Sequence, residues 1–371
     1  MSDSSRARQG LLIAGVACFA MMGVGQSLYG PTLPVFGRMF GVPQAETGLL
    51  VSAHWTGCAL GIAAMFAFGN RISPRHALAT MALGAAGLAS LAGWGATLAA
   101  AFVFGAGYAM ATAVFNPRVL AAFGPRGPSM LSLLNACFGI GAILAPLAFV
   151  RFGQDPRLAF LVTAGLAVAI WFLPGAGGAA PTPAPGSAQG FRPRLPILAF
   201  GAAAIGIEAS LIGLGPTALI AAGESEARAA EFLSVFFVVF LAARIVLTFT
   251  AHLVPSFVLF LSGLIAIACF ALLGATVSPA WAFVAMGASA GVFFPSYFVT
   301  ASQHMGTDPR VPPTIIGAGL VGGIFLPLIL SPLMVQLGER GFFWLVAGLA
   351  GAAALAGFVA LRPMLRPACA A

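Results

Sequence analysis

The feature that most constrains this chain is a succession of long apolar segments separated by short polar stretches. About 20 apolar residues in a helix span the ~30 Å hydrocarbon core of a bilayer. Segments of this kind recur twelve times along the 371 residues: 10–37, 46–70, 75–95, 97–119, 128–150, 156–174, 195–222, 227–251, 255–275, 279–303, 312–337 and 340–362. Since lipid offers the backbone no hydrogen-bond partners, each segment must form its own helix. The sequence therefore predicts an all-α membrane protein with twelve transmembrane helices.

The composition excludes a soluble globular protein, because 60% of the residues are hydrophobic and only 7% are charged. The net charge of +8 is carried by arginines that stand singly between apolar blocks. No basic cluster with interleaved aromatic residues is present, so nucleic acid is not an expected partner. The five cysteines have neither disulfide nor metal-site spacing, and no cofactor or metal is expected. The first apolar segment is full length and lacks a convincing cleavage site, so it is not a signal peptide.

The segments divide into two sets of six. The Pro/Gly/Ala/Ser-rich stretch 175–194 has the composition of a linker. It separates a predicted N-terminal six-helix bundle, residues 1–174, from a C-terminal one, residues 195–371. Gly141 and Gly322 each stand five residues before a Pro-Leu pair in the fifth and eleventh segments. Matched helices interrupted by Gly and Pro occur in transporters built from repeats, so we expect pseudo-symmetric bundles.

The arginines predict the orientation of the chain in the membrane. With an even number of spans both termini lie on one side. If that side is the cytoplasm, eleven arginines are cytoplasmic, five are external and Arg244 lies within a span. This distribution satisfies the positive-inside rule. We expect a multi-pass monomer of a bacterial-type inner (plasma) membrane, with both termini cytoplasmic.

Glu208 is the only acidic residue that we place deep inside an apolar segment. It is the single ionisable residue of 195–222, about 20 Å from the start of that helix. A carboxylate there costs several kcal/mol unless it is protonated, paired or facing water. Two interpretations stay open: a neutral carboxyl hydrogen-bonded to a neighbouring helix, or a polar cavity in which Glu208 carries a proton or contacts a solute. The flanking glycines and Pro216 favour the cavity, because they let the helix bend.

The chain resembles the major facilitator superfamily across essentially its whole length. The stretch Gly69-Asn70-Arg71-Ile72-Ser73-Pro74-Arg75 is similar to the loop signature of that superfamily, with asparagine where an acid is usual. Asn116-Pro117 and Phe138-Gly139-Ile140-Gly141-Ala142 resemble the fucose–galactose–glucose:proton symporter branch. The resemblance implies the major facilitator fold and transport by alternating access.

Two further elements carry the same resemblance into the second half. Ile205-Gly206-Ile207-Glu208 looks like the acidic element of the branch's seventh span, and Arg244 stands where a Gly-Arg pair is usual in the eighth. Acids that family members carry in the first and fourth spans are absent here, where Gln26, Tyr29 and Thr112 stand. Proton coupling would therefore rest on Glu208.

Polar and aromatic side chains within the spans are the candidates for a solute site, because polar solutes bind through amide, hydroxyl and aromatic groups in apolar cavities. Gln26 would line the pathway or form an interhelical hydrogen bond. Arg244 would face the cavity or extend to the interface. The predicted substrate-binding residues are Gln26, Tyr29, His54, Trp55, Asn116, Asn135, Glu208, Arg244 and Tyr297, with Glu208 also the proton-coupling residue.

Several of these candidates have structural alternatives. Trp55 fits an interfacial anchor, and His54 either titrates near neutrality or packs as a satisfied histidine. Asn116 and Asn135 fit an inner gate or a helix-end hydrogen bond. Tyr297 forms either a wall for a ring or ordinary packing.

The sequence thus predicts a secondary active transporter that moves a small polar solute, sugar-like or a related metabolite, with a proton. The alternatives are an efflux antiporter for an amphipathic compound and a non-transporting receptor with a transporter fold. The partners are the solute, the proton and the lipid bilayer. No HExxH, GxSxG or Walker motif is present, so an enzyme is not expected.

Overall fold

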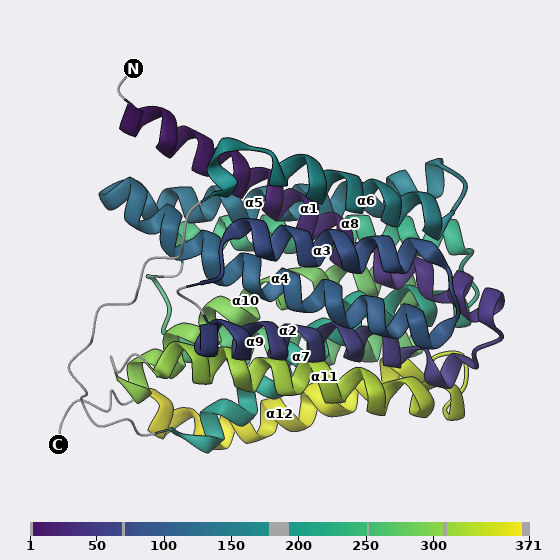
Figure 1. Cartoon of the computed structure of the whole chain (residues 1–371). Helices are drawn as coiled ribbons and strands as arrows, with labels where there is room; N and C mark the ends of the chain where they lie inside the picture. Colours follow the sequence, from purple (N-terminus) through teal and green to yellow (C-terminus); the bar gives the residue numbers. More distant parts are fainter. Residues whose placement is uncertain (1–2, 69–70, 178–192, 251, 307–309, 366–371) are drawn as a thin grey trace. The chain divides into compact units, whose positions relative to one another are not determined.

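The computed structural model describes residues 3–68, 71–177, 193–250, 252–306 and 310–365 (Figure 1). These residues form twelve α-helices, three short 3-10 helices and no strand, which confirms the predicted all-α fold class. The α-helices are α1 (Asp3–Phe40), α2 (Gly48–Phe68), α3 (Pro74–Ser90), α4 (Trp94–Phe123), α5 (Gly127–Arg151), α6 (Pro156–Trp171), α7 (Leu195–Ala221), α8 (Glu226–Thr250), α9 (Ser256–Thr276), α10 (Pro279–Met305), α11 (Val311–Gln336) and α12 (Gly341–Leu365). The 3-10 helices are η1 (Gln44–Glu46), η2 (Gly124–Arg126) and η3 (Pro174–Ala176).

Ten helices of the described chain are long and apolar enough to cross a membrane. The other two, α3 and α6, have 17 and 16 residues, so at ~1.5 Å per residue they measure about 25 Å. The segment predicted over 75–95 stops at Ser90 because Leu91 adopts a left-handed conformation with φ 53° and Gly93 has φ 109°. α6 ends shortly before Pro174, which begins η3.

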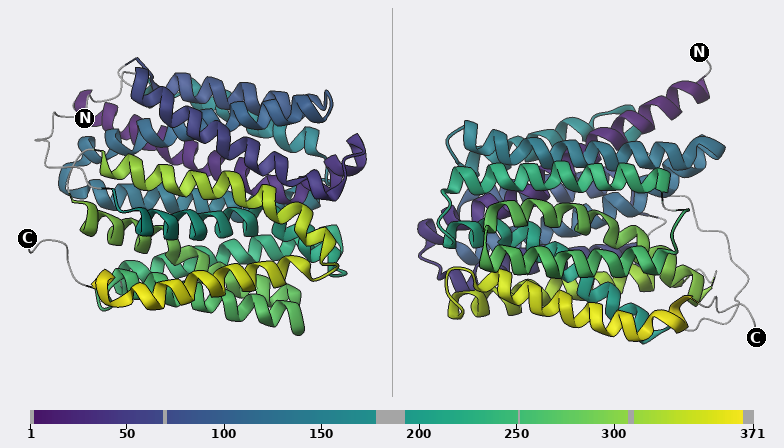
Figure 2. Two further views of the ribbon diagram at one scale, coloured as in Figure 1. Left: turned by 90° about the horizontal axis from the view of Figure 1, so that it is seen from below. Right: turned by 180° about the vertical axis from the view of Figure 1, so that it is seen from behind.

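The chain separates into two compact units. Unit 1 comprises Met1–Pro43 and Leu49–Pro183, and unit 2 comprises Gln44–Gly48 and Ala184–Ala371. Unit 1 therefore contains α1–α6 and unit 2 contains α7–α12, and Figure 2 shows the helices of each unit running side by side. Most of the predicted linker, residues 178–192, lies outside the described residues.

The two units use the same helix pairs. In unit 1, α1 lies along α5, and α3 contacts both α4 and α6. In unit 2, α7 lies along α11, and α9 contacts both α10 and α12. Matching the helices in chain order therefore superimposes one contact pattern on the other, as expected for pseudo-symmetric bundles.

Individual contacts repeat at an offset of about 182 residues. A Cβ on Gly141 would overlap the carbonyl oxygen of Ala20, and one on Gly322 would overlap that of Ala202. Small residues let membrane helices approach this closely, which strengthens dispersion contacts where no hydrophobic driving force exists. Because 202 − 20 is 182, the same shift places Gln26 of α1 at the position of Glu208 in α7.

Candidate functional site

A polar cluster in unit 1 joins three helices. The Tyr108 hydroxyl of α4 donates a 2.8 Å hydrogen bond to Oε1 of Gln26 on α1. The Gln26 side chain is buried. A polar group that loses contact with water is costly unless it is paired, so this hydrogen bond fixes the two helices against each other.

His54 of α2 lies at the centre of this cluster. Its Nδ1 is 3.2 Å from the Tyr29 hydroxyl, and its Nε2 is 3.7 Å from Sγ of Cys58. A neutral imidazole satisfies both contacts, with Nδ1 accepting from Tyr29 and Nε2–H donating to sulfur. Its ring also lies 5.3 Å from the Tyr108 ring and 5.5 Å from the Trp55 ring, both edge-on. The histidine is buried, so it holds the surrounding rings in place.

The cluster brings together four of the predicted residues, Gln26, Tyr29, His54 and Trp55, and adds Tyr108. Tyr108 was not among the predicted residues, although it is one of only three tyrosines in the chain. The signal that could have identified Tyr108 is a phenolic hydroxyl inside an apolar span, four residues before the hydroxyl of Thr112. One helical turn separates them, and the Thr112 hydroxyl donates to the Tyr108 carbonyl at 3.1 Å.

Glu208 and Arg244 are ionisable residues within the apolar helices of unit 2. Glu208 lies seven residues beyond Gly201, which contacts Tyr297 of α10. Seven residues are close to two helical turns, so Glu208 is on the face of α7 that points toward α10. Its Oε2 is buried and has no hydrogen-bond partner among the described protein atoms. The acid therefore keeps an acceptor that a proton or a ligand donor would satisfy.

Arg244 of α8 is held against α10 and acts on this acid. Its Nε donates a 3.2 Å hydrogen bond to the Gly291 carbonyl of α10. Its guanidinium also lies 4.4 Å from the centre of the Phe240 ring, in cation–π range. The Arg244 charge interacts electrostatically with Glu208. Unit 2 thus places an acid on α7 and a cation on α8, two helices that are in contact.

Tyr297 is packed within unit 2. The ring is buried against Gly201, and the Tyr297 hydroxyl donates to the Ile315 carbonyl of α11 at 3.1 Å. The Phe260 ring lies 6.4 Å away, centre to centre. These contacts make Tyr297 a bridge between α7, α10 and α11.

The two asparagines lie apart from the Tyr108 cluster. Asn135 is exposed and its amide donates to the Leu131 carbonyl one turn back in α5, at 2.9 Å. Asn116 is half-buried in α4, and its Oδ1 is buried without a hydrogen-bond partner among the described atoms. Asn116 is thus a second acceptor that a donor from outside the protein would satisfy.

Two apolar grooves in unit 1 contain none of the predicted residues. One, of about 270 Å³, lies between α1, α5 and α6, and the other, of about 520 Å³, lies between α3 and α6. Within the described residues, no group of three or more His, Cys, Asp or Glu side chains is placed to hold a metal ion.

Comparison with known structures places this arrangement among membrane transporters. The fold is similar to that of a D-xylose–proton symporter, with a TM-score of 0.77 and 14% identity over 94% of this chain and 97% of that chain. A POT family transporter in complex with a thioalcohol-conjugated peptide has a TM-score of 0.78 and 12% identity, over 96% and 97%. A variant of the E. coli fucose:proton symporter, FucP, has a TM-score of 0.63 and 16% identity, over 94% and 98%.

Comparison at the level of sequence gives the family. No curated protein matches the chain. The sequence model of the Major Facilitator Superfamily matches residues 15–318, which is most of the chain. The twelve helices and the repeated contact pattern agree with that match. The protein therefore belongs to the Major Facilitator Superfamily and is a membrane transporter, not an enzyme.

Proposed function

We propose that the protein couples the movement of a small polar solute to a proton that binds Glu208. The two bundles, residues 1–174 and 195–371 joined by the linker 175–194, would move relative to each other. This movement would open the path of the solute to one face of the membrane and then to the other. The solute is sugar-like or a related metabolite. Both termini lie in the cytoplasm of a bacterial-type cell, and the protein works as a monomer.

One observation carries this proposal, the unpaired Oε2 of Glu208 on the α10-facing side of α7. A charged carboxylate inside a membrane is costly, whereas a protonated one is tolerated when it finds an acceptor. Closing the site around Glu208 would therefore favour the protonated acid, and opening it to water would release the proton. A proton gradient could then bias which face of the protein opens.

Arg244 supports the same proposal. It stands on α8, which contacts α7, and a cation on a neighbouring helix would favour the ionised acid once the proton has left. The guanidinium is fixed to α10 through Gly291, so a movement of α10 relative to α7 would change that interaction. Protonation of Glu208 and the arrangement of these helices are then coupled.

The solute would be recognised by hydrogen-bonding groups and aromatic faces. The Gln26 amide and the Tyr108 hydroxyl supply the hydrogen-bonding groups, and the Trp55 and Tyr108 rings supply the aromatic faces. The equivalence of Gln26 and Glu208 in the repeat supports assigning the solute contacts of unit 1 to the helix position that the proton site occupies in unit 2. The E. coli symporter and the D-xylose symporter named above move sugars with protons, which agrees with this class of solute.

The proposal is tested with purified protein in two steps. A thermal-shift screen of sugars, organic anions and amphipathic compounds at two pH values identifies a stabilising ligand. Proteoliposomes loaded with that ligand then measure counterflow exchange, which needs no ion gradient. We expect a polar ligand, exchange by the wild-type protein, and stabilisation that depends on pH. Stabilisation by amphipathic compounds alone would favour efflux, and a stabilising ligand that is never exchanged would favour a receptor.

A further inference from the structure

The groove between α3 and α6 has the length of one membrane leaflet. It is lined by Leu78, Ala82 and Ala86 on α3 and by Ala164, Val168 and Trp171 on α6. From Leu78 to Ala86 the helical rise is about 12 Å, and with Arg75, about 4 Å before Leu78, the length is about 16 Å, close to half of the ~30 Å hydrocarbon core. The groove follows the middle of α3 and the second half of α6. Its dimensions fit the acyl chain of a lipid.

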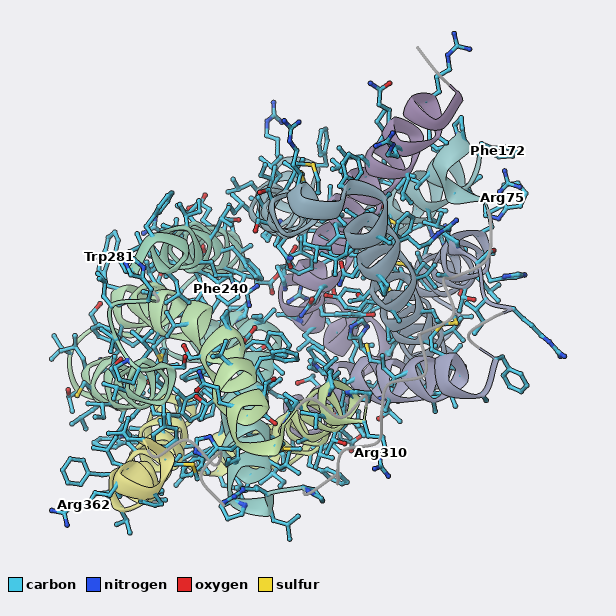
Figure 3. All side chains as sticks on the ribbon, turned by 90° about the vertical axis from the view of Figure 1, so that its left-hand side faces the viewer. Arg75, Phe172, Phe240, Trp281, Arg310 and Arg362 are labelled. Atoms are coloured by element: carbon cyan, nitrogen blue, oxygen red, sulfur yellow. The ribbon has the colours of Figure 1, made fainter. Side chains whose placement is uncertain are left out.

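A fixed cation stands at the end of this groove. Arg75 is the second residue of α3, and its guanidinium carbon lies 5.1 Å from the centre of the Trp171 ring at the end of α6. Figure 3 shows Arg75 and Phe172 next to each other at the edge of their unit. Phe172, which also lines the groove, has 70% of its surface exposed. The stacked guanidinium keeps its N–H groups available at the mouth of the groove.

The part of the chain around Arg75 carries no acidic residue. Between Glu46 and Asp155, and again between Asp155 and Glu208, the sequence contains no acidic residue. Asp155 precedes α6 at the helix's other end, about 24 Å from Trp171 by helical rise. Among the residues that the structure describes, no ion pair involves Arg75. An anion from outside the protein would pair with Arg75 at this exposed position.

We propose that the groove between α3 and α6 binds a glycerophospholipid with an anionic headgroup, whose phosphate pairs with Arg75 and whose acyl chain lies along the groove. The guanidinium donors of Arg75, on its Trp171 platform, match phosphate oxygens in a bidentate geometry. A headgroup without a cation of its own leaves the charge of that phosphate for Arg75 to balance, which selects anionic lipids. The alanines of the groove leave the space that the chain fills. This site is separate from Glu208 and from the Tyr108 cluster.

The test compares two lipids with identical acyl chains, phosphatidylglycerol and phosphatidylcholine, added to delipidated full-length protein and counted by native mass spectrometry. We expect wild-type protein to retain phosphatidylglycerol about fivefold more strongly, the factor given by one arginine near an anionic lipid surface. R75Q should abolish this preference. R362Q, which removes an exposed arginine near the end of α12, should leave it unchanged. Equal retention of both lipids by wild-type protein, or the same loss in R75Q and R362Q, would overturn the proposal.

Two further arms separate the headgroup from the groove. A82L narrows the groove and keeps Arg75, so it should weaken retention of both lipids. Inorganic phosphate up to millimolar concentration should not displace phosphatidylglycerol, because it has no chain to fill the groove. Displacement by phosphate would identify a simple anion site and refute the lipid assignment. R75K, which keeps the charge without the planar stack, should show an intermediate preference and serves as the folded reference should R75Q express poorly.

Discussion

The hydrogen bond between Tyr108 and Gln26 permits a quantitative test of the cluster in unit 1. Y108F removes the donor and leaves the ring, and Q26M removes the amide while roughly keeping the side-chain volume. The Tyr108 hydroxyl and Oε1 of Gln26 are 2.8 Å apart, and Gln26 has only 8% of its surface exposed. Either single change therefore leaves the remaining partner without this hydrogen bond, and Gln26 would then be unpaired in a buried position.

The expected magnitude follows from that geometry. Interhelical hydrogen bonds in membrane proteins contribute about 0.6–2 kcal/mol, and this one is short and joins a buried glutamine to a half-buried tyrosine, which places it in the upper half of that range. We expect each single variant to lower the free energy of unfolding by about 1–2 kcal/mol. The double variant should cost little more than one single variant, because no buried partner is then left unpaired. The coupling energy of the cycle should be about 1 kcal/mol.

The assay is reversible unfolding of detergent-solubilised protein by sodium dodecyl sulfate, followed by far-ultraviolet circular dichroism. Unconnected sites add within about 0.5 kcal/mol. Purely additive losses would therefore show that the hydrogen bond contributes nothing to stability, and the cluster would lose its structural basis. If the cluster also contacts the solute, Y108F should weaken ligand binding by more than its effect on unfolding explains. The exposed Asn135, changed to alanine, serves as a control for the unfolding measurement.

Two other variants test unit 2. G201A places a methyl group against the buried Tyr297 ring, so the free energy of unfolding should fall by about 1–3 kcal/mol. G348A on α12 is the control, because a Cβ there meets nothing within 4 Å, and it should cause no loss. Equal effects of the two variants would refute the contact. R244K keeps a positive charge but loses the planar donor to Gly291 and the stack on Phe240, so it should lower both stability, by about 1 kcal/mol, and the rate of counterflow. Full counterflow in R244K would mean that only the charge matters.

Much of the fold follows from the sequence because lipid leaves the backbone few choices. Each apolar segment must satisfy its own hydrogen bonds, so all twelve helices could be predicted. Their ends were harder to predict, since α3 ends at Ser90 because Leu91 has a left-handed backbone conformation that hydropathy does not encode. The glycines that meet Ala20 and Ala202 were recognised from their spacing to proline, and the structure gives the reason, which is close approach of the two backbones.

The candidate site was predicted less completely. Glu208 stood out because one acid in an apolar segment needs an explanation. Tyr108 did not, because a tyrosine in a membrane helix is unremarkable until its hydroxyl is known to meet Gln26. Cys58 stands one helical turn after His54, so that contact is open to prediction from spacing, whereas the contact of His54 with Tyr29 depends on how α1 and α2 are rotated. Contacts between helices follow from packing, which one sequence does not specify.

The central claim is that Glu208 carries the proton, and the most direct measurement is solute accumulation in proteoliposomes. One acid deep in the spans implies one proton per transport cycle. A pH difference of one unit supplies about 1.36 kcal/mol per proton, so with the membrane potential held at zero a neutral solute should accumulate at most about tenfold. E208Q should exchange the solute yet fail to accumulate it, while E339Q, an exposed control, should behave as wild type. Accumulation driven by the pH gradient in E208Q would contradict the account.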